Sequence, residues 1–230
     1  IGTRRFFVEI LDLIFPKRCV GCGALGGYFC RKCRMRIRPI APNESICPVC
    51  ERAAIGGATH PRCRTRFGID GLTSFFHYDG AVRAAVKAIK YRYVSDLAKG
   101  FVSLVPEINT PRADVIIPIP LHAQRQRERG FNQAEKLAEK IAVRLQMPMR
   151  TDILTRTRKT VPQVAMSRRI DRLKNMHGVF VVMPGSVKAI KAMSILVFDD
   201  VFTTGATMRE AAMALKRGGA SVVWAVTMAR

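Results

Sequence analysis

The chain has 230 residues, enough for one large domain with a small module attached. Its apolar content of 48% suits a packed core, and no apolar run approaches the ~20 residues of a membrane span. The formal net charge of +22 favours a polyanionic partner, either nucleic acid or phosphorylated small molecules, without naming a substrate.

The N-terminal stretch "RRFFVEILDLIFPKRC" places two arginines before apolar residues, as a secretory leader does. Glu9 and Asp12 interrupt the stretch, and no small-residue cleavage site follows. We therefore expect a short amphipathic helix here, no membrane insertion and a cytoplasmic location.

All seven cysteines lie between Cys19 and Cys63. Six form three pairs separated by two residues, and Cys63 follows His60 by three positions. A two-residue gap lets the chain turn so that both side chains point at one tetrahedral ion. Without an export signal disulfides are disfavoured, so the pattern predicts structural Zn²⁺, with two ions per chain.

The spacing leaves the grouping of these ligands open between a sequential and an interleaved arrangement. The sequential sets are Cys19, Cys22, Cys30 and Cys33, followed by Cys47, Cys50, His60 and Cys63. Four protein ligands close each site, which is typical of structural rather than catalytic zinc. Such a short segment, poor in large apolar residues, is expected to need the metal to fold.

The middle of the chain alternates strand-like and helix-like segments. Residues 72–78 have strand composition, and helices are predicted from 81 and over 95–105 from their apolar spacing. A short strand over 115–120, a basic loop and a helix over 131–145 follow. The basic segment from Arg156 to Lys174 lacks a clean period, and both a solvated surface loop and a lid for phosphates fit it.

Residues 195–198 form a continuous apolar run, typical of a parallel strand buried on both faces. A helix signal begins at Thr207, and another apolar strand spans 221–229. This βαβ pattern predicts an α/β fold with a parallel sheet, whose ligand crevice lies beyond the carboxyl ends of the strands.

Asp199 and Asp200 end the first of these strands, directly before a turn rich in threonine and glycine. A helix start offers free N–H groups and a partial positive charge to a phosphate. The two carboxylates can accept from ribose hydroxyls or hold Mg²⁺. The stretch therefore predicts a ribose 5-phosphate site, and the absence of a Walker A sequence argues against a nucleoside triphosphatase.

The string "VFDDVFTTGAT" resembles the 5-phosphoribosyl-1-pyrophosphate (PRPP) motif of type I phosphoribosyltransferases. Over nearly the whole chain, the paired CxxC units, "RGFNQA" at 129–134 and Lys159-Thr160-x-x-Gln163 resemble the ComF family of competence proteins. The chain departs from that family at His60, usually cysteine, and at Phe202, commonly tyrosine.

The resemblance implies a type I phosphoribosyltransferase-like parallel sheet with helices on both faces, preceded by a double zinc ribbon. The expected division is 1–66 and 67–230, with a core at 111–230. The implied PRPP-binding residues are Asp199, Asp200, Val201, Phe202, Thr203, Thr204, Gly205, Ala206 and Thr207. The implied lid or phosphate contacts are Arg129, Arg156, Lys159, Arg168 and Arg169.

The resemblance further implies that the protein binds PRPP with Mg²⁺ and handles single-stranded DNA during natural transformation. A competence helicase or other DNA-processing proteins would be its partners. One alternative is an active phosphoribosyltransferase that transfers ribose 5-phosphate to a base or amine. Another is a metal-stabilised regulator that retains the fold as a ligand sensor.

Overall fold

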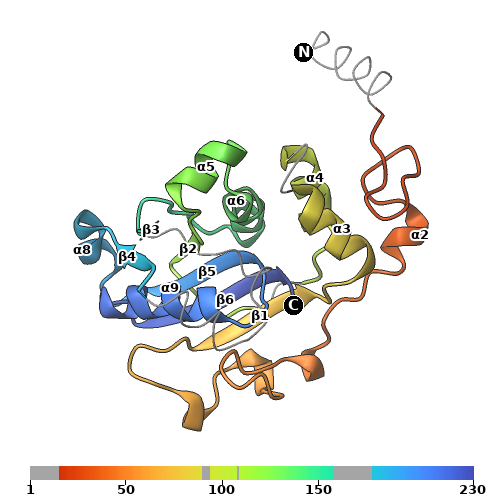
Figure 1. Cartoon of the computed structure of the whole chain (residues 1–230). Coiled ribbons are helices and arrows are strands. Elements are labelled where there is room, and N and C mark those ends of the chain that lie inside the picture. The colour runs from red at the N-terminus through yellow and green to blue at the C-terminus, as the bar shows by residue number, and fades with distance from the viewer. Residues whose placement is uncertain (1–15, 90–93, 108, 158–177) are drawn as a thin grey trace.

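The computed structural model describes residues 16–89, 94–107, 109–157 and 178–230. At its centre is a sheet of four parallel strands in the order β1-β6-β5-β2 (Figure 1). The strands are β1 (Gly71–Phe76), β2 (Val115–Pro118), β5 (Ser194–Val201) and β6 (Val222–Ala229). All four carboxyl ends therefore meet at one edge of the sheet.

Helices cover both faces of this sheet because side chains on the central strands alternate between two cores. Ile195 and Val197 face a cluster that includes α9 (Ala206–Arg217). Leu196 and Phe198 face the opposite cluster. That cluster is completed by α3 (Gly80–Ile89), α4 (Val94–Val102) and α6 (Gln133–Leu145). The predicted α/β fold class is confirmed.

Shorter elements surround the sheet. Two of them, β3 (Leu154–Arg156) and β4 (Phe180–Val182), pair as an antiparallel ribbon that the sequence did not indicate. The other α-helices in the described parts of the chain are α2 (Arg31–Arg34), α5 (Ala123–Arg129) and α8 (Val187–Ile190). No helix in the described parts of the chain is both long enough and apolar enough to cross a membrane.

Most predicted elements differ from the structure by a few residues at their ends, and two of the differences bear on the site. The expected basic loop after β2 contains the helix α5, which His122 caps at its start and Gly130 ends in the left-handed conformation. The strand expected over 195–198 continues through the two acids, because Asp199 and Val201 still pair with β6. The predicted N-terminal amphipathic helix lies mainly outside the described residues.

The cysteine-rich region contacts both faces of the sheet by passing around the edge strand β1. Its first half packs Val20 and Phe29 against the core beneath α3 and α4, while Ile46 and Val49 pack on the α9 face. Between these halves, Ile40 donates its N–H to the carbonyl of Phe75 in β1 at 2.9 Å. The connection thus covers part of the exposed edge of β1.

The close contact between β1 and β6 at Gly71 predicts a stability effect. A Cβ added at Gly71 would lie 2.2 Å from the Trp224 ring, which donates a hydrogen bond to Thr73 at 3.0 Å. We expect Gly71→Ala to lower the free energy of unfolding by ~1–3 kcal/mol through overpacking. Urea unfolding measures this change in the free energy of unfolding. Gly27→Ala is the control, because no atom lies within 4 Å of a Cβ added there. Equal stability of the two variants would contradict the prediction.

Candidate functional site

The first four cysteines come together as the sequential grouping predicts. The ligand atoms of Cys19, Cys22, Cys30 and Cys33 all lie within 4.8 Å of one another. The Sγ atoms of Cys22 and Cys30 are 3.6 Å apart. Zn–S bonds of ~2.3 Å in a tetrahedron separate sulfurs by ~3.8 Å, so this set fits one structural Zn²⁺.

The second set joins three cysteines and a histidine. Cys47, Cys50, His60 and Cys63 also gather within 4.8 Å. The Nδ1 atom of His60 lies 3.3 Å from the Cys50 sulfur, and its Nε2 lies 2.9 Å from the Ala53 carbonyl. In the tautomer whose Nε2–H donates to that carbonyl, Nδ1 would be the metal ligand. The structure therefore supports two structural zinc sites and excludes the interleaved arrangement.

Backbone groups prepare two of these sulfurs for metal binding. Burial alone would raise the pKa of Cys19, but N–H groups of Cys30, Gly21 and Cys22 bond to its sulfur and lower the pKa to about 6. Burial would likewise raise the pKa of Cys47, but hydrogen bonds from backbone N–H groups outweigh burial and lower that pKa to about 7. The lowered pKa values of Cys19 and Cys47 favour the thiolate, which is the form that binds Zn²⁺.

The carboxylate pair lies at the carboxyl end of β5. Asp199 is half-buried and Asp200 is buried. The Oδ1 atom of Asp199 accepts the N–H of Asp200 at 2.8 Å, which fixes the first carboxylate against the backbone. Because the strand pleat alternates, the two side chains leave β5 on opposite faces at the crevice edge.

The turn after β5 leads directly into α9. Val201 is the last residue of β5, and Phe202 is buried in the α9-face core. Gly205 is the N-cap residue of α9, with a φ of 68° that favours glycine. Among the described residues, the buried hydroxyl of Thr204 has no hydrogen-bond partner. The turn residues Thr203, Thr204, Gly205, Ala206 and Thr207 thus lead into and include the N–H groups of the first turn of α9.

Two of the predicted basic residues are described, and they lie on different elements. Arg129 ends α5 and donates to the Gln133 side chain at 3.1 Å. Arg156 ends β3, where burial and the nearby Arg125 lower its pKa, while the charge of Asp199 opposes that shift. Arg156 and Asp199 are therefore electrostatic neighbours. The other predicted contacts, Lys159, Arg168 and Arg169, lie outside the described residues.

Sequence reasoning missed Arg125 and Arg209. Arg125 lies in the segment expected to be a loop, and its effect on Arg156 depends on the folding of α5. Arg209 lies on α9 and donates to the carbonyl of Thr204 at 2.8 Å. A lone arginine in an amphipathic helix carries no sequence signal for such a contact.

Comparison with protein families matches residues 10–64 to the double zinc ribbon domain. The chain is 29% identical over 218 residues to competence protein ComFC of Bacillus subtilis, covering 87% of this chain and 83% of that protein. It is also 29% identical over 203 residues to DNA utilization protein YhgH of Salmonella typhi, covering 83% of this chain and 86% of that protein. These matches confirm the resemblance to the ComF family.

A shorter match of 32% identity over 117 residues is to competence protein F of Haemophilus influenzae, covering 51% of this chain and 50% of that protein. Among solved structures, the glutamine PRPP amidotransferase of B. subtilis, complexed with ADP and GMP, aligns at 15% identity with a TM-score of 0.36. That alignment covers 64% of this chain and only 26% of the amidotransferase.

Proposed function

The chain resembles ComF-type proteins over most of its length, and on this premise we propose that it binds PRPP or another ribose 5-phosphate and acts in the handling of single-stranded DNA. The observation that carries the ligand proposal is the pairing of Asp199 and Asp200 with the turn that opens α9. The end of β5 and the turn that follows it together offer acceptors for a sugar and donors for a phosphate.

In this proposal the 5-phosphate lies against the turn from Thr203 to Thr207, where the N–H groups at the start of α9 and the threonine hydroxyls donate to its oxygens. The buried Thr204 hydroxyl would gain its hydrogen bond from this ligand. Val201 and Phe202 would hold the turn at the correct distance from the acids. The ligand domain would span 67–230, and the zinc module 1–66.

Asp199 and Asp200 would accept hydrogen bonds from the 2- and 3-hydroxyls of the ribose. Their carboxylates also suit Mg²⁺, which when bound would neutralise charge on the diphosphate of PRPP. Arg129 of α5 and Arg156 of β3 would contact the phosphates, as would Lys159, Arg168 and Arg169 of the basic segment. Isothermal titration of the zinc-loaded protein with PRPP and Mg²⁺ tests this site directly.

An active phosphoribosyltransferase is the second candidate. It is supported by the electrostatic interaction of Arg156 with Asp199, which would supply a cation and an anion to the ligand. Departure of pyrophosphate develops positive charge on the sugar and negative charge on the leaving group, and fixed charges of both signs would stabilise them. Pyrophosphate release from PRPP with a panel of bases and amines separates turnover from binding alone.

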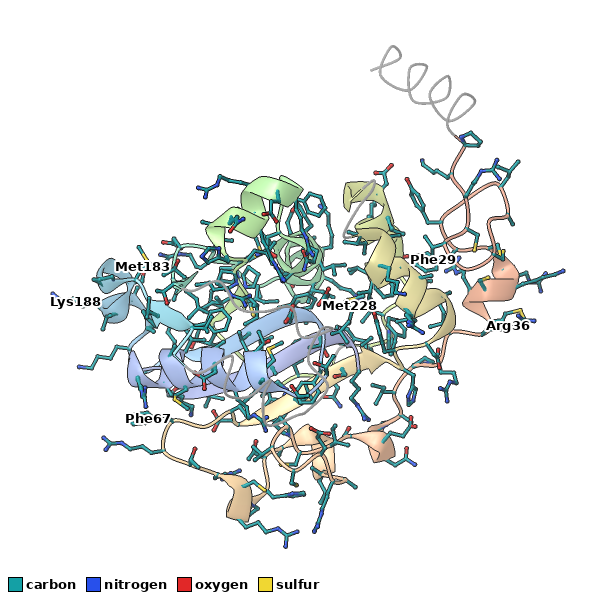
Figure 2. The ribbon with its side chains drawn as sticks, viewed as in Figure 1. Phe29, Arg36, Phe67, Met183, Lys188 and Met228 are labelled. Atoms are coloured by element: carbon teal, nitrogen blue, oxygen red, sulfur yellow. The ribbon has the colours of Figure 1, made fainter. Side chains whose placement is uncertain are left out.

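The DNA part of the proposal is supported by the names of the relatives, competence protein and DNA utilization protein, and by the net charge of +22. The zinc module carries exposed basic residues on and beside α2, namely Arg31, Lys32, Arg34 and Arg36. Figure 2 shows Arg36 on the outside of this module, far from Lys188 at the other end of the molecule. Helicases or other DNA-processing proteins are the partners that we propose.

Binding to single-stranded DNA is expected to depend steeply on salt. Removing one side chain that pairs with a phosphate should reduce the slope of log affinity against log salt by about 0.7. We expect Arg31→Gln/Lys32→Gln/Arg34→Gln to reduce that slope by about 2, measured by fluorescence anisotropy of a labelled oligothymidylate. The control Lys188→Gln/Lys191→Gln changes exposed charges at α8 and should leave it unchanged. Absence of binding by the unaltered protein at low salt would refute the DNA proposal.

A further inference from the structure

The second zinc knuckle, residues 47–50, is in contact with the turn that opens α9. Pro48 and Val49 are the two residues between the ligands Cys47 and Cys50. Arg209 donates from Nη1 to the carbonyl of Val49 at 3.3 Å and from Nη2 to the carbonyl of Thr204 at 2.8 Å. One guanidinium thus joins the metal knuckle to the turn.

Packing supports the same connection. A Cβ at Gly205 would lie 3.2 Å from the carbonyl oxygen of Pro48, so the knuckle and the turn are in close contact. Cys47 is fully buried, and Val49 packs against the core cluster that contains Phe202 and Ala206. The knuckle therefore forms part of the wall against which the turn is folded.

We propose that the second zinc set positions the phosphate-binding turn, and that Arg209 is the positioning residue through which it acts. Bound zinc would fix the spacing of Cys47 and Cys50 and hence the direction of the Val49 carbonyl. The planar fork of Arg209 then has one rigid anchor and holds the Thr204 carbonyl with its other nitrogen. The inference rests on the proposed function, because it concerns the same phosphate site.

The position of the first zinc set makes this coupling specific. That set belongs to the half of the module that packs through Val20 and Phe29 on the opposite face of the sheet. The Val49 and Pro48 carbonyls that approach Arg209 and Gly205 both come from the second knuckle. The double ribbon thus has one half beside α3 and α4 and the other beside the ligand turn (Figure 1).

The first test compares Arg209→Met with Arg217→Met, a matched change at the other end of α9. Arg217 lies over the Phe67 ring at 5.7 Å and does not belong to the proposed site. We expect Arg209→Met to weaken ribose 5-phosphate binding about tenfold in isothermal titration, and Arg217→Met to leave it unchanged. Arg209→Lys reaches one carbonyl at a time and should weaken binding about threefold. Zinc content should stay at the wild-type value in all three.

The second test removes a zinc ligand with Cys63→Ser, alone and combined with Arg209→Met. If zinc acts through Arg209, the single changes should weaken ribose 5-phosphate binding by similar factors, and the double change by little more than either. The coupling would be refuted if Cys63→Ser weakened binding by the same factor in the Arg209→Met variant as in the unaltered protein. Wild-type affinity in Arg209→Met would refute it as well.

Hydrogen exchange separates this inference from the proposed function. Amides of 203–209 should exchange faster in Arg209→Met than in Arg217→Met, with or without a ligand. If the unaltered protein binds no ribose 5-phosphate, the proposed function fails, while exchange still decides whether Arg209 holds the turn. Equal exchange in the two variants would refute the positioning role, even where Cys63→Ser fails to fold.

Discussion

Replacing both acids at the end of β5 should strongly weaken ligand binding and leave the protein folded. We expect Asp199→Asn/Asp200→Asn to weaken PRPP binding at least about a hundredfold, because each carboxylate would lose charged hydrogen bonds worth ~1.5–3 kcal/mol. Asparagine keeps the side-chain volume, and its Oδ1 can still accept the Asp200 N–H that now bonds to Asp199 at 2.8 Å. Isothermal titration with Mg²⁺ present measures the loss.

The matched control for this pair is Asp114→Asn. Asp114 is exposed and accepts the N–H of Ser194 at 2.8 Å, at the opposite end of β5 from the acids. Its replacement should leave PRPP affinity unchanged. Zinc content and melting temperature should match the wild type in both variants. Undiminished PRPP binding by the double variant would show that the ligand site lies elsewhere.

Much of this fold could be predicted from apolar periodicity, and the exceptions have physical reasons. Helix α5 was missed because its sequence, AQRQRER, has no apolar face, and its ends depend on the His122 cap and Gly130. The ribbon of β3 and β4 was missed because its strands are three residues long and lie on either side of the long basic segment. Strands this short carry little periodic signal.

The candidate site also combines features that are visible in the local sequence with features that only the fold creates. Its acids, its turn and the zinc ligands are local patterns, in which chemistry depends on spacing, so the sequence alone indicates them as candidates. The contact of Arg209 with the Val49 carbonyl joins residues 160 positions apart in the chain. Only the folded arrangement shows it. The grouping of the cysteines was undetermined for the same reason, since both arrangements satisfy the local spacing and only the tertiary structure separates them.

Removing zinc should unfold the cysteine-rich region selectively. We expect about two zinc ions per chain by elemental analysis, one for each ligand set. Structural zinc contributes ~10–16 kcal/mol to the folding of small zinc modules, far more than the few buried apolar side chains here can replace. A strong chelator at neutral pH should therefore remove amide protection throughout residues 17–66, as measured by hydrogen exchange with mass spectrometry.

The edge of the sheet determines how far this unfolding spreads. The N–H of Thr59 donates to Asp70, and that of Ile40 to Phe75, so unfolding of the zinc module removes partners of β1 and of the residue before it. Exchange should rise in β1, while β5 and β6 keep the protection of their parallel pairing inside the two cores. A stoichiometry near one, or full protection of residues 17–66 after chelation, would contradict the two-site assignment. Loss of protection in β5 would instead show that zinc supports the whole fold, because the two halves of the module pack against both faces of the sheet.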